Sequence, residues 1–145
     1  MAKRWIGGLT GFVIVLILVG CGSQGATGQV ESLSPEEMEK YIENNETAYI
    51  LINSTEDEEE RKANNQLVEE SIETIKVKEI NAQSTKMLEN DLELNDLGLK
   101  NIQFGTLGIY ENGSLTKYVS LRSVDHPSED EKEKALQEFI ENNAS

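Results

Sequence analysis

The feature that most constrains this chain is the stretch at residues 48–61, where a short apolar run passes abruptly into a string of acids. The run at 49–52 (YILI) is long enough for a buried strand and too short for a helix. The polar residues that follow predict a turn and the start of a helix. Many α/β proteins keep their chemistry at such a junction, because the turn and the helix N-terminus project beyond the sheet. Here it holds the acidic run 56–60 and no cysteine, histidine or glycine-rich loop.

The N-terminal residues 1–20 have the pattern of a targeting segment. Lys3 and Arg4 give a positive start, and 12–19 is an uninterrupted apolar run (FVIVLILV) that is short for a membrane-spanning helix. The sequence Leu-Val-Gly-Cys at 18–21 resembles a bacterial lipobox. The resemblance implies cleavage before Cys21, a diacylglyceryl anchor on its sulfur, palmitate labelling, and a place on the extracytoplasmic face of the cell membrane. An ordinary secretory signal and a single-span anchor are the alternatives.

Cys21 is the only cysteine, so a lipidated chain has no thiol for a disulfide or for dithiol chemistry. Residues 22–32 are rich in Gly, Ser and Gln and predict a flexible tether. The expected organisation is therefore a signal peptide at 1–20, a lipidated cysteine and linker at 21–32, and one folded domain at 33–145.

The charge of the mature chain limits its partners. The full chain has 27 acidic and 13 basic residues. Loss of Lys3 and Arg4 leaves 11 basic residues, a net charge of −16. Nucleic-acid binding needs clustered Lys and Arg, so this balance argues against it. The negative net charge favours solubility as its main role. A cationic or metal partner is the more specific alternative.

Capping residues and apolar spacing predict the remaining elements. Ser34, Pro35 and Glu37 form a strong helix start, and Thr55 with Glu58 is a second possible capping box. Asn112–Gly113 is a hairpin signal. The predicted elements are a helix at 35–44, a strand at 48–53, a helix at 56–73 with Ala63, Leu67, Val68 and Ile72 facing inward, a strand at 76–81, a helix from 84 to 97 stopped by Gly98, strands at 104–111 and 115–121, and a last helix after Ser128.

This order predicts a mixed sheet of four strands flanked by helices. It resembles the thioredoxin-like fold, and in particular the small proteins called bacteriocin transport accessory proteins. Three stretches carry the resemblance: 50–55 (ILINST), 97–107 (LGLKNIQFGTL) and 110–115 (YENGSL). The resemblance implies an α/β thioredoxin-like domain over about residues 34–142.

The sequence differs from the family at the positions of the family's reactive residues. Glu56 and Glu59 occupy the positions that match the two cysteines of Cys-x-x-Cys, and Gly105, followed by Thr106, occupies the position of the cis-proline. Carboxylates cannot attack or resolve a disulfide. A cis bond before Gly105 would cost about 2.5–4 kcal/mol. We therefore expect no dithiol oxidoreductase activity, a trans Phe104–Gly105 bond and a relaxed loop.

The sequence predicts no enzyme activity and no cofactor. It favours a lipid-anchored accessory module that binds a peptide or protein partner, with peptide or bacteriocin export as a possible setting. Two alternatives stay open. The acids at 56–60 could bind a divalent cation or support carboxylate catalysis. The segment 13–20 (VIVLILVG) resembles the pheromone peptides that some Gram-positive bacteria release from lipoprotein signals.

Overall fold

The computed structural model of the chain describes residues 29–143. The predicted signal peptide, the lipidation site Cys21, the first part of the tether and the pheromone-like segment lie outside the described residues. No helix among residues 29–143 is long and apolar enough to cross a bilayer.

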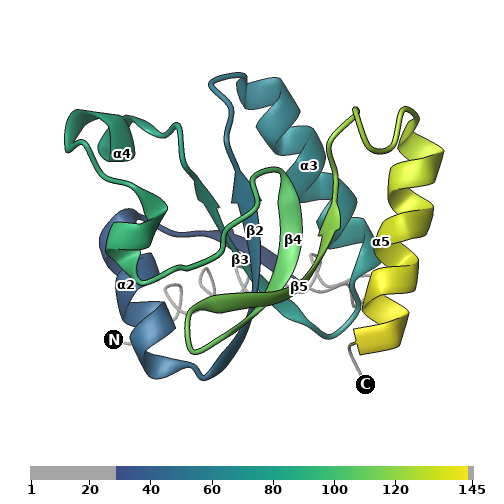
Figure 1. Ribbon diagram of the computed structural model, residues 1–145. Helices are drawn as coiled ribbons and strands as arrows, with labels where there is room; N and C mark the ends of the chain where they lie inside the picture. The colour runs from purple at the N-terminus through teal and green to yellow at the C-terminus, as the bar shows by residue number, and fades with distance from the viewer. Residues whose placement is uncertain (1–28, 144–145) are drawn as a thin grey trace, which may run out of the picture.

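A mixed sheet forms the middle of the domain (Figure 1). Its strands are β1 (Gln29–Ser32), β2 (Thr47–Asn53), β3 (Lys76–Asn81), β4 (Thr106–Glu111) and β5 (Ser114–Ser120), in the spatial order β1-β3-β2-β4-β5. β1 and β2 lie parallel to β3, whereas β4 is antiparallel to both β2 and β5. The predicted mixed sheet is confirmed, but it has five strands and not four.

The additional strand is β1, at the end of the segment expected to be tether. Its residues pair with β3 from Gln29 opposite Lys76 to Ser32 opposite Glu79. The Val30 N–H, on the outer edge, donates to Glu69 Oε2 at 3.3 Å. The sequence QVES carries little strand signal of its own, because its side chains are mostly exposed and polar. Pairing with β3 gives these residues their conformation, so residues 29–32, which the sequence assigns to the linker, form a strand of the sheet.

Helices cover both faces of the sheet (Figure 1). One face carries α2 (Pro35–Asn44), α4 (Thr85–Glu89) and the short 3-10 helix η2 (Leu94–Leu97) over Ile50, Ile52 and Ile80. The other carries α3 (Glu58–Ser71) and α5 (Glu129–Asn143) over Leu51, Val77 and Leu107. The alternation of β2 residues between two apolar cores explains why its sequence reads as one continuous hydrophobic run.

Capping residues place most helix starts where expected. The Ser34 hydroxyl accepts from the Glu37 N–H at 3.2 Å, and the Glu37 carboxylate accepts from the Ser34 N–H at 2.9 Å, which completes the predicted capping box. Ser128 accepts from the Glu131 N–H at 3.2 Å before α5. The hairpin turn is also confirmed, with positive φ at Asn112 (53°) and Gly113 (85°).

The helix predicted from 84 to 97 is two short helices. α4 ends at Glu89, and Asp91 has a φ of 53°, a left-handed conformation that interrupts the helical path. The chain resumes as η2, which Gly98 ends with a φ of 97°. Leu94 and Leu97 are still buried as expected, so apolar spacing located the core residues correctly and missed the break between them.

Candidate functional site

The turn between β2 and α3 is held by side chains that bond to the backbone. Thr55 Oγ1 accepts from the Asp57 N–H at 2.9 Å and donates to Glu60 Oε1 at 2.8 Å. Asp57 is the N-cap residue of α3, because its Oδ1 accepts from the Glu59 N–H at 2.9 Å. The predicted Thr55–Glu58 capping box is therefore wrong: the helix begins two residues later than expected, and a carboxylate in place of a hydroxyl meets its positive end.

Glu56 and Glu59, which the resemblance matches to the two family cysteines, lie beyond the end of β2. Glu56 is in the turn and Glu59 in the first turn of α3, and both are exposed. Within residues 29–143, no group of three or more His, Cys, Asp or Glu side chains lies close enough to hold a metal ion. The acids at 56–60 therefore project from the helix start without converging on one point.

The loop before β4 is tied to the sheet through Gly105. The Gly105 N–H donates to the Ile52 carbonyl at 2.7 Å, and its carbonyl accepts from the Leu121 N–H at 2.8 Å. Gly105 has a φ of 70°, and the described residues contain no cis peptide bond, which confirms the trans Phe104–Gly105 bond. The expectation of a relaxed loop is not met, because two backbone hydrogen bonds join this residue to the ends of β2 and β5.

Thr106 points into the fold and away from solvent. It is buried at the start of β4, and its hydroxyl donates to the Gln103 carbonyl at 2.8 Å. This bond fixes the turn that brings Phe104 to the surface. The sequence predicts that this strand begins at Phe104, but strand pairing begins at Thr106.

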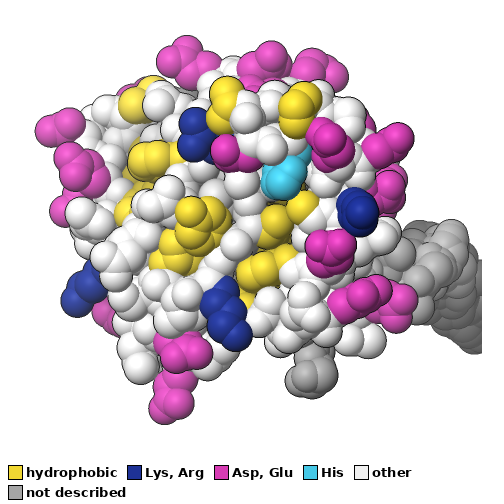
Figure 2. Space-filling model, turned by 45° about the vertical axis from the view of Figure 1, so that its right-hand side comes forward, with side chains coloured by type: hydrophobic (Ala, Val, Ile, Leu, Met, Phe, Trp, Pro, Cys, Tyr) yellow, Lys and Arg dark blue, Asp and Glu magenta, His cyan; other side chains and the backbone are white. Residues whose placement is uncertain are grey.

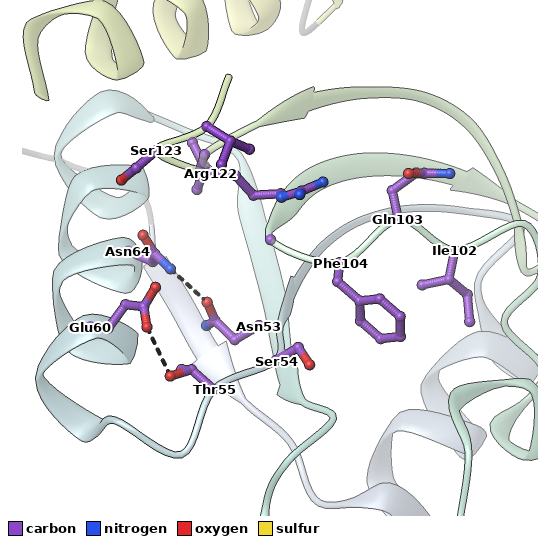
Figure 3. A pocket seen from close by; sticks show the side chains of 13 residues that line it. Asn53, Ser54, Thr55, Glu60, Asn64, Ile102, Gln103, Phe104, Arg122 and Ser123 are labelled. Carbon is purple, nitrogen blue, oxygen red and sulfur yellow. Dashed lines mark hydrogen bonds between the residues drawn. The ribbon is translucent and has the colours of Figure 1, made fainter. Parts of the chain in front are cut away.

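A groove of about 510 Å³ lies between this turn, the start of α3 and the segment after β5. We call it the Gly105 groove (Figure 3). Many of its polar side chains come from the strand–helix junction, and its apolar side chains come from the loop before β4 and from Leu121 and Val124. The lining residues used below are Thr55, Glu60, Ile102, Phe104, Leu121, Arg122 and Val124. Of the four predicted site residues among residues 29–143, only Gly105 lines it.

Large apolar side chains are exposed at this groove. Phe104 is 49% exposed and Val124 is 75% exposed. Figure 3 shows the Phe104 and Ile102 side chains on one side of the groove and the polar side chains of Thr55, Glu60 and Asn64 on the other. Exposed aromatic and branched side chains beside polar groups are typical of binding surfaces.

A second groove, also of about 510 Å³, adjoins the first one at Phe104. We call it the α4 groove. Met87, Leu92 and Leu94 supply apolar side chains and Glu93 supplies a carboxylate. It shares Ser54, Ile102 and Phe104 with the Gly105 groove, so the two hollows meet at the Phe104 side chain. The sequence did not reveal this groove, because it depends on the break between α4 and η2.

A buried polar network joins the strands and the helix that carry the site. Glu79, fully buried on β3, accepts from Arg61 on α3, from the Ser32 hydroxyl at 2.6 Å and from Asn53 Nδ2 at 2.8 Å. Burial raises the pKa of Glu79, but the hydrogen bonds from Arg61, Asn53 and Ser32 outweigh it and hold this pKa below its ordinary value. The bond to Glu79 in turn raises the pKa of Arg61.

The network continues to the floor of the Gly105 groove. The side-chain oxygen Oδ1 of Asn53 accepts from Asn64 Nδ2 at 2.9 Å, and Asn81 Oδ1 accepts from the Thr55 N–H at 3.1 Å. These bonds fix the end of β2 and the turn after it. The sequence signal for this network is Glu79, a charged residue inside a predicted strand, which hydrophobic patterning alone does not mark as buried.

The comparisons with known proteins give distant structural likenesses. No family model matches the chain, and no curated protein matches it. Among solved structures, it is similar to Trxlp from Edwardsiella tarda EIB202, with 16% identity, a TM-score of 0.41, and coverage of 77% of this chain and 98% of that one. It is also similar to the J-Trx1 fragment of ERdj5, with 13% identity, a TM-score of 0.39, and coverage of 80% of this chain and 52% of that one.

Both TM-scores are below 0.5, and the fold is defined by the chain's own elements. After β1 they follow the predicted order α-β-α-β-α-β-β-α, with η2 inserted after α4. The domain is an α/β protein whose order of elements resembles that of the thioredoxin-like fold.

Proposed function

We propose that this protein is a lipid-anchored extracytoplasmic module whose thioredoxin-like domain binds an extended peptide at the Gly105 groove and performs no redox chemistry. The anchor is Cys21, and the resemblance to bacteriocin transport accessory proteins suggests peptide export as the setting.

The observation that carries the peptide-binding proposal is the state of the loop before Gly105. Among the described residues, the backbone N–H of Gln103 and both backbone polar groups of Phe104 have no hydrogen-bond partner. They lie beside the half-exposed Phe104 side chain, at the edge of a groove. Unpaired backbone groups next to apolar side chains are what an extended peptide requires, because its main chain pairs with the backbone while its side chains enter the hollows.

The proposal of a redox-inactive module rests on residue chemistry. The folded domain contains no cysteine, and the residues at the expected reactive positions are carboxylates, which cannot form a mixed disulfide. Insulin reduction by dithiothreitol should proceed at the same rate with and without this protein. Acceleration would contradict the proposal.

Peptide binding can be tested with a pair of aromatic variants. Phe104 and Tyr118 are each 49% exposed, but Tyr118 lines neither groove. The full chain, purified in nonionic detergent, is presented to an array of extended peptides of varied sequence. We expect Phe104→Ala to lose most of the binding and Tyr118→Ala to retain it. Equal binding by both variants, or no binding by the unaltered protein, would overturn the proposal.

A further inference from the structure

We propose that the partner is a basic, apolar extended segment that lies across both grooves, with one apolar side chain on each side of Phe104 and Lys or Arg at its flanks. This inference rests on the proposed function and names the class of peptide that the site would take.

The meeting of the two grooves at Phe104 sets the spacing of the apolar residues. In an extended chain, residues i and i+2 point to the same side and lie roughly 6.6–6.8 Å apart. Phe104 lines both grooves, and its side chain is half-exposed. A peptide that crosses this ring therefore places residue i in one hollow and residue i+2 in the other, with residue i+1 turned away.

Apolar contacts are available in each hollow. The Gly105 groove offers the exposed Val124 beside the buried Leu121, and the α4 groove offers the partly buried Leu92 beside the buried Met87 and Leu94. These side chains contain no polar atom other than the Met87 thioether sulfur. The two hollows therefore favour aliphatic or aromatic side chains of the peptide. Filling both hollows would remove Phe104 from water on both of its faces.

Charge determines what flanks the apolar pair. Each groove includes one carboxylate, Glu60 in the Gly105 groove and Glu93 in the α4 groove. Glu56, Asp57 and Glu59 follow the groove residue Thr55 along the chain, and all three are exposed. Arg122 is the one cation that lines the grooves, so acids predominate around them.

The rest of the domain adds to the negative electrostatic potential around the grooves. All 27 acidic residues and 11 basic residues lie within 29–143, a net charge of −16. Figure 2 shows Asp and Glu spread around the visible face, apolar side chains gathered near its centre, and few Lys or Arg between them. Such a surface attracts a cationic segment and repels an acidic one, a second copy of this domain included.

The test uses four amidated heptapeptides and fluorescence anisotropy on the full chain in nonionic detergent. The reference peptide has two leucines separated by one serine and two lysines at each end. One variant replaces the lysines with glutamates and another with glutamines. The last keeps the lysines and places the two leucines side by side.

We expect the lysine peptide to bind at least about tenfold more tightly than the glutamate peptide at low ionic strength, with the difference shrinking as salt is added. The peptide with adjacent leucines should bind several-fold more weakly. Glu60→Gln combined with Glu93→Gln should reduce the preference for lysine over glutamine flanks. The matched pair Glu43→Gln with Glu138→Gln, which lies outside both grooves, should leave it unchanged.

The outcomes separate this inference from the proposed function. Equal affinity for lysine and glutamate flanks, with binding still lost in Phe104→Ala, would overturn the basic partner and retain peptide binding. Equal affinity for separated and adjacent leucines would overturn the crossing of Phe104. No binding of any peptide would overturn both proposals.

Discussion

Arg61 and Glu79 form a two-pronged ion pair between α3 and β3, in which Arg61 Nε donates to Glu79 Oε2 at 2.9 Å and Nη2 donates to Oε1 at 2.8 Å. The Glu79 side chain is fully buried, whereas that of Arg61 is 23% exposed. The Ser32 hydroxyl on β1 contacts both partners, at 2.6 Å from Glu79 and 3.2 Å from Arg61. One pair therefore joins a helix, a central strand and the edge strand.

Removing the arginine should destabilise the domain. Arg61→Ala leaves the Glu79 carboxylate buried without its cation, a change that costs about 3–5 kcal/mol for fully buried pairs. Because Arg61 is partly exposed, we expect a loss of about 2–3 kcal/mol in the free energy of unfolding, measured by urea denaturation. Lys62→Ala, on the exposed side of the same helix, should change it by less than about 0.5 kcal/mol. A loss no larger than that of the Lys62 variant would contradict this role.

The same pair predicts a loss of stability in acid. The pKa of Glu79 is lowered in the folded protein relative to its ordinary value of 4.5, so the unfolded chain binds a proton first as the pH falls. The contribution of Glu79 is therefore complete above about pH 4.5 and is lost as the pH falls through the lowered folded-state pKa. In urea titrations below pH 5, Glu79→Gln should show a shallower dependence of unfolding free energy on pH than the unaltered protein. Equal slopes would mean that Glu79 does not titrate with a lowered pKa.

Gly105 should resist substitution for two separable reasons. A Cβ at this residue would lie 2.7 Å from Arg122 Cγ, and the φ of 70° is unfavourable for any L side chain. The left-handed conformation alone costs roughly 1–2 kcal/mol, and the close contact adds to this. We expect Gly105→Ala to lose more stability than that and the double variant Gly105→Ala/Arg122→Ala to recover the contact part, measured as a double-mutant cycle. Strict additivity of the two changes would show that Arg122 does not lie against Gly105.

The Tyr110 hydroxyl is buried and has no hydrogen-bond partner among the described residues. Burial raises the pKa of Tyr110, so the hydroxyl stays protonated. An unpaired buried polar group costs about 1–3 kcal/mol, so Tyr110→Phe should leave the melting temperature unchanged or raise it. Tyr49→Phe is the matched control, because the Tyr49 hydroxyl donates to the Asn143 carbonyl at 2.9 Å and its loss should cost about 1 kcal/mol. Destabilisation of Tyr110→Phe as large as that of Tyr49→Phe would reveal a bound partner.

Lipidation of Cys21 is tested by palmitate labelling in a bacterial host. Cys21→Ser should abolish the label and shift the protein from the membrane fraction to the medium, or leave it unprocessed, because the thioether can form only on sulfur. Ser23→Ala, two residues away, should keep both the label and the membrane location. Unchanged labelling of Cys21→Ser would contradict the anchor.

Much of the fold could be predicted because local and tertiary signals agree. The capping box at Ser34, the apolar run in β2, the Asn112–Gly113 turn and the apolar stripe of α5 each carry their own sequence mark. β1 carries little such signal, because an edge strand of mostly polar residues is specified by its neighbour β3. The break after α4 was missed for a related reason: the left-handed residue Asp91 leaves the apolar spacing intact.

The N-terminal half of α3 shows why the site was only partly predicted. Hydrophobic spacing placed Ala63 inward, but Ala63 is exposed, whereas Arg61, Asn64 and Asn65 are partly buried and bond to the polar side chains of the sheet. The periodicity of apolar residues detects apolar contacts. It does not detect a helix that packs polar side chains against Glu79 and Asn53. Where α3 meets apolar residues, at Val68 and Ile72, the prediction was correct.

The direction of β1 has a consequence for how the domain would stand on a cell. β1 runs parallel to β2 and β3, so Gln29 lies beside Lys76 at the start of β3, at the opposite end of the sheet from Asn53 and the two grooves. With Cys21 lipidated, the eight Cα steps to Gln29 span at most about 29 Å. The anchor would then hold the domain by the end that carries Gln29. The two grooves, at the opposite end, would face away from the bilayer, toward molecules that arrive from or leave for the surroundings of the cell.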